Sequence, residues 1–132
     1  MKELHILLVE DNEGDVILTL DAFEESEIKT KISVAKNGKD ALDFLFKRES
    51  FKDVEKPDLV LLDLNIPIFS GMEVLKEVRQ HPILKKMPII ILTTSSNPIE
   101  INKANEYQAN NFVTKPIDMT EILKTILSLE EF

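Results

Sequence analysis

The chain has 132 residues, of which 43% are hydrophobic and 30% are charged, a composition typical of one soluble globular domain. Its net charge of −8 argues against nucleic acid as a partner, because such binding depends on Lys and Arg neutralising phosphates. The lack of cysteine excludes disulfides and thiolate sites, and no apolar run approaches the roughly 20 residues of a membrane span. We therefore expect a single cytoplasmic domain over residues 1–132, without a membrane partner.

Five apolar, β-rich runs alternate with helical patterns along the chain. The predicted strands cover residues 4–9, 31–35, 59–62, 89–92 and 111–113. The first, third and fourth runs are nearly continuous Val, Ile and Leu, which is typical of strands covered on both faces.

Helical patterns fill the segments that follow the strands. Their apolar stripes are formed by Val16, Leu20 and Phe23, by Leu75 and Val78, and by Ile122, Leu123, Ile126 and Leu127. A more polar helix is predicted over residues 98–108, and the second helix follows a turn at Asn37-Gly38. The His81-Pro82 step should end the third helix, and a polar loop covers residues 47–56.

Five β/α units with buried strands predict an α/β fold, a doubly wound parallel sheet with five helices. Ligands of such sheets bind beyond the carboxyl ends of the strands, at the point where the strand order reverses. The residues that follow the strands are therefore the candidates for a functional site.

Polar or charged residues stand at these strand ends. Glu10 and Asp11 follow the first strand, Asp63 follows the third, Thr93 the fourth and Lys115 the fifth. Three carboxylates at one edge would repel one another and raise some pKa values unless a cation joins them. Mg²⁺ is the natural candidate, because it prefers a few carboxylate and carbonyl oxygens and accepts phosphate oxygens as further ligands.

This set of groups is sufficient for phosphoryl transfer to Asp63. A carboxylate can accept a phosphoryl group as an aspartyl phosphate. The reaction needs mainly in-line positioning and positive charge, which the metal and Lys115 would supply, while Thr93 offers a hydroxyl donor. Each residue alone also has a structural explanation, such as an acidic pair at a helix N-terminus or an aspartate that caps a loop. The combination at four strand ends favours the functional reading.

These residues, in this order, resemble the receiver domain of two-component response regulators. Glu10-Asp11 matches the acidic pair, Asp63 the phosphoacceptor, Thr93 the switch hydroxyl and Lys115-Pro116 the lysine with its typically cis proline. Gly71 stands where the family keeps a glycine. The resemblance covers essentially the whole chain and implies the flavodoxin-like (CheY-like) strand order 2-1-3-4-5.

The resemblance also implies a role for each position. Asp11 would hold Mg²⁺ directly, Glu10 would do so through water, and the Asn65 backbone carbonyl would be a further ligand. Lys115 would contact the phosphoryl group, with its place set by a cis bond before Pro116.

In the family, a switch carries the phosphorylation signal to the surface. Thr93 would move toward the phosphate, and Phe112, the aromatic of the fifth strand, would turn inward to fill the gap. Phe112 lacks the hydroxyl of the more usual tyrosine, and Thr94 is bulkier than the small residue often found there. A permanently packed core aromatic remains the alternative for Phe112.

Three features resemble the stand-alone regulators that are paired with phytochrome-type histidine kinases. They are the extended loop before Pro57, the 92–95 stretch and the ending at Glu130, Glu131 and Phe132. The resemblance implies a sensor histidine kinase as phosphodonor and a homodimer through the face of the fourth helix and fifth strand. Because no effector domain is expected, the output would be a protein contact or transfer of the phosphoryl group to another protein.

Three other functions are weaker. A flavodoxin-like FMN carrier needs a phosphate loop rich in Ser, Thr and Gly, whereas this loop is acidic. A phosphatase of the haloacid-dehalogenase type needs a second Asp where Asn65 stands, so we expect no enzyme beyond catalysis of its own phosphorylation and dephosphorylation. A receiver-like binding module without chemistry is also disfavoured, since every reactive group is present.

Overall fold

The computed structural model describes residues 3–94 and 97–129. Residue 95 and residues 130–132, which belong to the subfamily pattern, lie outside the described residues.

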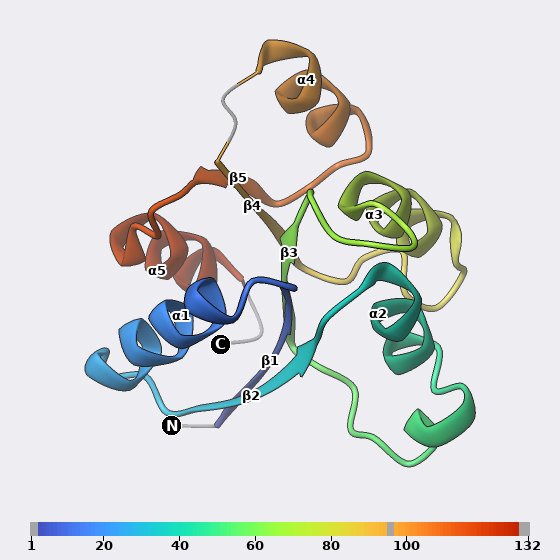
Figure 1. Ribbon diagram of the computed structural model, residues 1–132, viewed down its shortest axis with the longest axis horizontal. Coiled ribbons are helices and arrows are strands. Elements are labelled where there is room, and N and C mark those ends of the chain that lie inside the picture. Colours follow the sequence, from blue (N-terminus) through green and yellow to red (C-terminus); the bar gives the residue numbers. More distant parts are fainter. Residues whose placement is uncertain (1–2, 95–96, 130–132) are drawn as a thin grey trace.

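All five strands are parallel and form one sheet in the order β2-β1-β3-β4-β5 (Figure 1). They are β1 (Leu4–Val9), β2 (Thr30–Ala35), β3 (Leu59–Asp63), β4 (Ile89–Thr93) and β5 (Asn111–Thr114). The five predicted strands are confirmed, each to within one residue at either end. The strand order reverses between β1 and β3, so ligands are expected beyond the carboxyl ends of these two strands.

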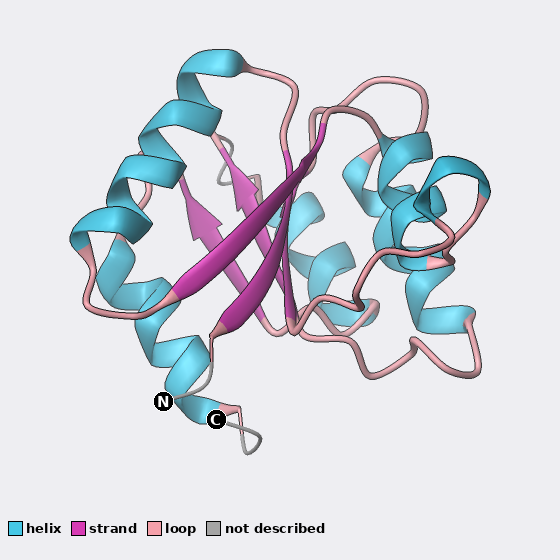
Figure 2. Ribbon diagram, turned by 90° about the horizontal axis from the view of Figure 1, so that it is seen from below, coloured by secondary structure: helices cyan, strands magenta, loops and turns pink. Residues whose placement is uncertain are grey.

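Helices cover both faces of the sheet (Figures 1 and 2). They are α1 (Glu13–Glu25), α2 (Gly38–Leu45), α3 (Gly71–Gln80), α4 (Pro98–Glu106) and α5 (Met119–Ser128), with a short 3₁₀ helix η1 (Glu49–Phe51). On one face α1 and α5 pack against Ile6, Leu8 and Leu61. On the other, α2 and α3 pack against Leu7 and Val60. The predicted doubly wound α/β fold is therefore confirmed.

Two local predictions differ from the structure. Leu127 is 78% exposed, because α5 buries the stripe of Ile122 and Ile126, and the residue after Ile126 is rotated about 100° away from it. The predicted loop over 47–56 contains η1. The third helix ends at Gln80, directly before the His81-Pro82 step, as predicted.

A side-chain cap starts each of the five α-helices that follow the strands. In each cap a side-chain oxygen accepts a hydrogen bond from a backbone N–H of the first turn, and the capping residues are Asn12, Asn37, Ser70, Asn97 and Asp118. Within the described residues, no helix is both long and apolar enough to cross a membrane.

Candidate functional site

Asp63 is the last residue of β3, the central strand, and therefore lies at the carboxyl edge of the sheet, where its side chain is nearly buried. Its Oδ1 accepts a hydrogen bond from the Asn65 N–H at 3.0 Å. The following loop turns back tightly, because the Gly71 N–H donates to the Leu64 carbonyl at 3.0 Å. A Cβ at residue 71 would lie only 2.3 Å from the Asp63 carbonyl oxygen, so the close approach requires glycine.

Glu10 follows β1 and is 1% exposed. Its backbone N–H donates to the Ala35 carbonyl at 2.9 Å, which extends the β1–β2 pairing and fixes the residue. Burial, together with the neighbouring Asp63, raises the pKa of the Glu10 carboxyl to about 7, and a hydrogen bond from Lys115 opposes this rise. The carboxylate repulsion that the sequence predicts is therefore present at Glu10.

Glu10, Asp11 and Asp63 form an acidic cluster at the carboxyl edge. Each offers one carboxylate oxygen, and these oxygens lie within 4.8 Å of one another. Asp11 is exposed, whereas the other two are buried. An oxygen donor set with one side open to solvent fits a hard divalent cation that keeps part of its water shell. Asn65 adjoins the cluster through its N–H, and its carbonyl as a ligand stays a prediction.

Lys115 follows β5 and brings one positive charge to this cluster. Its Nζ donates to Asp63 Oδ2 at 3.0 Å, to Asp15 Oδ2 at 2.8 Å and to Glu10 Oε1. Burial alone would lower the pKa of the ammonium, but the three carboxylates outweigh burial and raise that pKa above its ordinary value. The Lys115-Pro116 bond is cis, as the resemblance implies.

The acidic pair Glu10-Asp11 does not cap α1. The N-cap is Asn12, whose Oδ1 accepts a hydrogen bond from the Asp15 N–H at 3.0 Å. The pair therefore does not supply the cap, but its structural explanation is partly correct for Glu10, whose carboxylate accepts a hydrogen bond from the Asn12 N–H at 3.3 Å beside the helix N-terminus. The corresponding explanation for Asp63 is partly correct, since its carboxylate does hold the Asn65 N–H.

The model of the response regulator receiver domain matches residues 6–127. The chain belongs to the response regulator receiver family. Rcp1, a response regulator of Synechocystis, is 35% identical over 127 residues, which are 96% of this chain and 86% of that protein.

Solved structures agree with this assignment. The Mn²⁺-bound form of Rcp1 has a TM-score of 0.82 at 34% identity and covers 98% of this chain and 93% of its own. The bacteriophytochrome response regulator AtBRR has a TM-score of 0.88 at 36% identity, and the match covers 100% of this chain and 96% of the AtBRR chain. The phosphorylated cyanobacterial phytochrome response regulator RcpA has a TM-score of 0.83 at 32% identity, and the match covers 99% of this chain and 94% of the RcpA chain. The resemblance to phytochrome-associated regulators is therefore confirmed.

The predicted switch residues of this receiver domain lie on adjacent strands. Thr93 ends β4 and is fully buried, and its carbonyl accepts a hydrogen bond from the Lys115 N–H at 2.6 Å. Phe112 of β5 is half-buried and packs against the same core cluster as α2 and α3. Thr94 is exposed. Movement of Thr93 or Phe112 stays a prediction.

The receiver domain holds a fourth carboxylate that sequence reasoning missed. Asp15 lies in the first turn of α1, where acidic residues are common because of the helix dipole, so its residue type alone does not mark it as part of a site. The available signal was its spacing: Asp15 stands four residues after Asp11, just inside a helix that starts at the site edge.

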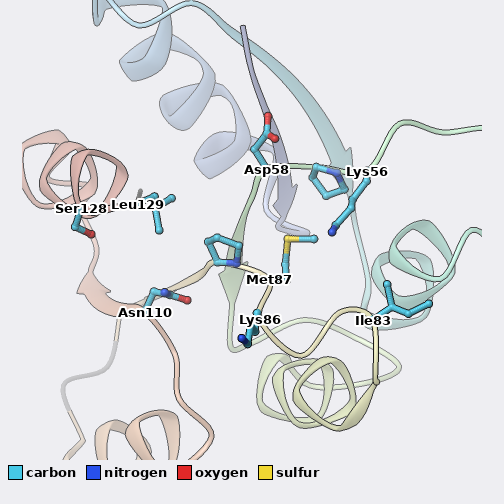
Figure 3. Close-up of a pocket in the computed structure, with 10 residues that line it drawn as sticks. Lys56, Asp58, Ile83, Lys86, Met87, Asn110, Ser128 and Leu129 are labelled. Atoms are coloured by element: carbon cyan, nitrogen blue, oxygen red, sulfur yellow. The ribbon is translucent and has the colours of Figure 1, made fainter. Parts of the chain in front are cut away.

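A cavity of 580 Å³ lies at the opposite, amino edge of the sheet (Figure 3). Its lining includes Asp58, Met87 and Asn110, which precede or adjoin the starts of β3, β4 and β5, together with Lys56 and Lys86. None of the acidic cluster lines this cavity. This cavity and the acidic cluster are therefore at opposite ends of the sheet.

Proposed function

We propose that the chain accepts a phosphoryl group from a sensor histidine kinase on Asp63, with Mg²⁺ as cofactor. One observation carries the proposal. The carboxylate of Asp63 lies where the acidic cluster meets the ammonium of Lys115, with 3.0 Å between Asp63 Oδ2 and Lys115 Nζ. A nucleophile with a cation site on one side and a fixed ammonium on the other has the electrostatic surroundings that phosphoryl transfer requires.

Each residue contributes a separate part of the reaction. With acetyl phosphate as donor, one Asp63 oxygen forms the new P–O bond, and the bond from phosphorus to the acetate oxygen breaks, so that acetate leaves with the electron pair. Lys115 neutralises charge on the phosphoryl oxygens, and Thr93 donates a hydrogen bond to one of them. Glu10, Asp11 and the Asn65 carbonyl would hold Mg²⁺ together with Asp63. The bound ion would supply further positive charge to the transferring oxygens.

The proposed partners follow from the same resemblance. Relatives that are named as phytochrome and bacteriophytochrome response regulators support a phytochrome-type histidine kinase as donor. The output is a change in protein contacts or passage of the phosphoryl group to another protein. Ile99 of α4, which is 70% exposed, offers an apolar side chain to a homodimer through the α4–β5 face.

Intact-mass measurement after incubation with acetyl phosphate and Mg²⁺ tests the site. The wild type should gain the mass of one phosphoryl group, and Asp63→Asn should gain none. Asp58→Asn is a matched control, because Asp58 lies at the amino edge of the sheet, and it should gain the same mass as wild type. An equal gain in Asp63→Asn would disprove the assignment.

Sedimentation of the phosphorylated and unphosphorylated forms tests the output. Phosphorylation should shift the monomer–dimer equilibrium, and Ile99→Asp should prevent dimer formation without changing the mass gain at Asp63. Dimers that persist in Ile99→Asp would show that another surface is used.

A further inference from the structure

Lys115 has one partner that the proposed chemistry does not use. Its Nζ lies 2.8 Å from Asp15 Oδ2, compared with 3.0 Å from Asp63 Oδ2. Asp15 is not a member of the acidic cluster, and its side chain is 34% exposed at the rim of the site. Asp15 therefore contacts the cation of the site from outside the group of candidate metal ligands.

The other two partners of Lys115 have a second task. Glu10 and Asp63 belong to the group that can hold a divalent cation, and Asp63 is the proposed phosphoacceptor. A carboxylate that binds a divalent cation, or that is esterified to phosphorus, offers less negative charge to an ammonium. Asp15 has neither task, so its charge would stay available to the ammonium throughout the proposed reaction.

The backbone of Asp15 is fixed independently of its carboxylate. Its N–H donates to the Asn12 cap at 3.0 Å, and its carbonyl accepts a hydrogen bond from Thr19 Oγ1 at 2.8 Å. Both contacts involve main-chain atoms of residue 15 and do not require an acidic side chain. The first turn of α1 can therefore hold the Asp15 carboxylate at a constant place beside Lys115.

We propose that Asp15 is a positioning residue that keeps the Lys115 ammonium beside Asp63 while Glu10 and Asp63 serve the divalent cation and the phosphoryl group. This inference rests on the proposed phosphorylation of Asp63 and names the residue that holds its lysine in place. Asp15 acts through Lys115 and needs no contact with the phosphoryl group.

Asp15→Asn is the decisive variant, because it keeps the size of the side chain and both main-chain contacts. Glu13→Gln is the matched control. Glu13 lies in the same first turn, so Glu13→Gln also removes one negative charge near the helix N-terminus. The Glu13 carboxylate, however, pairs with Lys36 instead of Lys115, and its side chain is 64% exposed. A difference between the two variants therefore reports the contact with Lys115 rather than the helix dipole.

The first readout is the rate of phosphoryl acceptance from acetyl phosphate with Mg²⁺, followed by intact mass. Loss of a group that orients a reacting side chain typically costs about tenfold or more, and we expect about tenfold slower acceptance in Asp15→Asn. Glu13→Gln should stay within about threefold of wild type. Asp15→Glu should recover part of the rate, since it restores the charge at a slightly different reach.

The second readout is the ¹⁵N–¹H NMR signal of the Lys115 ammonium with Mg²⁺ and without a phosphoryl donor, assigned by its absence in Lys115→Met. The signal should be observable in wild type and Glu13→Gln, because a held ammonium exchanges its protons slowly, and it should broaden beyond detection in Asp15→Asn. An Asp15→Asn protein that matches Glu13→Gln in both readouts would overturn the positioning role. A different result would overturn only the proposed function: the wild type gains no phosphoryl mass, while the Lys115 ammonium signal is present in the wild type and absent in Asp15→Asn.

Discussion

The carboxyl edge around Asp63 and the α4–β5 face differ in how firmly their residues are held. At the edge, Glu10 and Asp63 are buried and hydrogen-bonded to Lys115. Glu10 follows β1 and Asp63 ends β3, and both strands are covered on both faces. On the α4–β5 face, α4 buries only Ala104 of its nine residues, and Ile99 is 70% exposed.

This difference would separate the proposed chemistry at Asp63 from its proposed readout at the α4–β5 face. A preorganised site lowers the cost of arranging groups around the phosphoryl group, whereas a helix with few buried side chains can shift at low cost. The receiver domain thus combines a firmly held acidic edge with a helix, α4, that is anchored by few buried side chains.

A pair of truncations should show the difference most strongly. Leu61→Ala in β3 removes a fully buried side chain and should lower the free energy of unfolding by about 2–5 kcal/mol, because it leaves a cavity in the core. Ile99→Ala in α4 should lower it by less than about 0.5 kcal/mol. Urea unfolding followed by circular dichroism measures both values. Similar losses in the two variants would mean that α4 is anchored as firmly as β3.

Replacing Lys115, which carries the ammonium of the site, should separate the effect on metal binding from the effect on phosphoryl transfer. Lys115→Met should slow phosphoryl acceptance by about 10²–10³-fold, since it removes charge stabilisation from the transferring oxygens. It should also strengthen Mg²⁺ binding, because the ammonium no longer competes for Glu10 and Asp63. Acetyl phosphate kinetics and calorimetric Mg²⁺ titration measure the two effects. Lys124→Met, at an exposed position of α5, is the control. Weaker Mg²⁺ binding in Lys115→Met would show that the lysine does not compete with the cation.

The carboxyl edge around Asp63 is also the part of the molecule that could be predicted best from the sequence. Nearly continuous Val, Ile and Leu runs predict buried parallel strands, and the residues at their ends must then meet at one edge. Glu10, Asp11, Asp63 and Lys115 are brought together for this reason. The local failures have equally plain causes: Leu127 extends an apolar stripe in sequence but faces solvent in α5.

Asp15 shows why the remainder of the site could not be predicted. Its contact with Lys115 joins residues 100 positions apart, from α1 and from the loop after β5, and depends on how the first turn of α1 lies over the sheet edge. The spacing from Asp11 places Asp15 near the site, but no local pattern encodes its contact with a lysine 100 positions away. The half-buried state of Phe112 likewise depends on the packing of β5 against its neighbours, which residue type alone does not determine.

The pKa of Glu10 predicts how metal binding responds to pH. Because the carboxyl of the metal-free fold has a pKa of about 7, raised from 4.5, it carries a proton below that pH, and a cation must displace this proton. Mg²⁺ affinity should therefore fall by up to about tenfold per pH unit below pH 7 and level off above it. Calorimetric titrations between pH 5.5 and pH 8.5 (chosen to span about 1.5 units on either side of the pKa) measure this dependence.

Glu10→Gln is the control for this effect. It should bind Mg²⁺ more weakly at high pH and show a flatter pH dependence, since the titrating group is gone. The same raised pKa affects the free energy of unfolding without metal. The protonated Glu10 stabilises the folded state relative to the unfolded state most strongly at low pH, and this stabilisation is lost as pH rises from 4.5 through about 7. An unchanged slope in Glu10→Gln would assign the titration to another group.

The smallest expected effect concerns the α4–β5 face, where the emission of a single tryptophan at position 112 can report the environment of that side chain. The chain has no tryptophan, so Phe112→Trp introduces one reporter. If the ring turns inward on phosphorylation, its emission should shift to shorter wavelength after acetyl phosphate and Mg²⁺ are added. Phe51→Trp in η1, far from β5 in sequence, should show no shift.

Adding Thr93→Val to the reporter variant tests whether the ring responds through Thr93. Valine keeps the shape of the buried side chain but cannot donate a hydrogen bond to the phosphoryl group, so the mass gain at Asp63 should persist while the emission shift disappears. A shift that survives Thr93→Val would show that Phe112 responds by another route. No shift in Phe112→Trp itself would identify Phe112 as a permanently packed core residue, and the readout would then have to involve another part of the α4–β5 face.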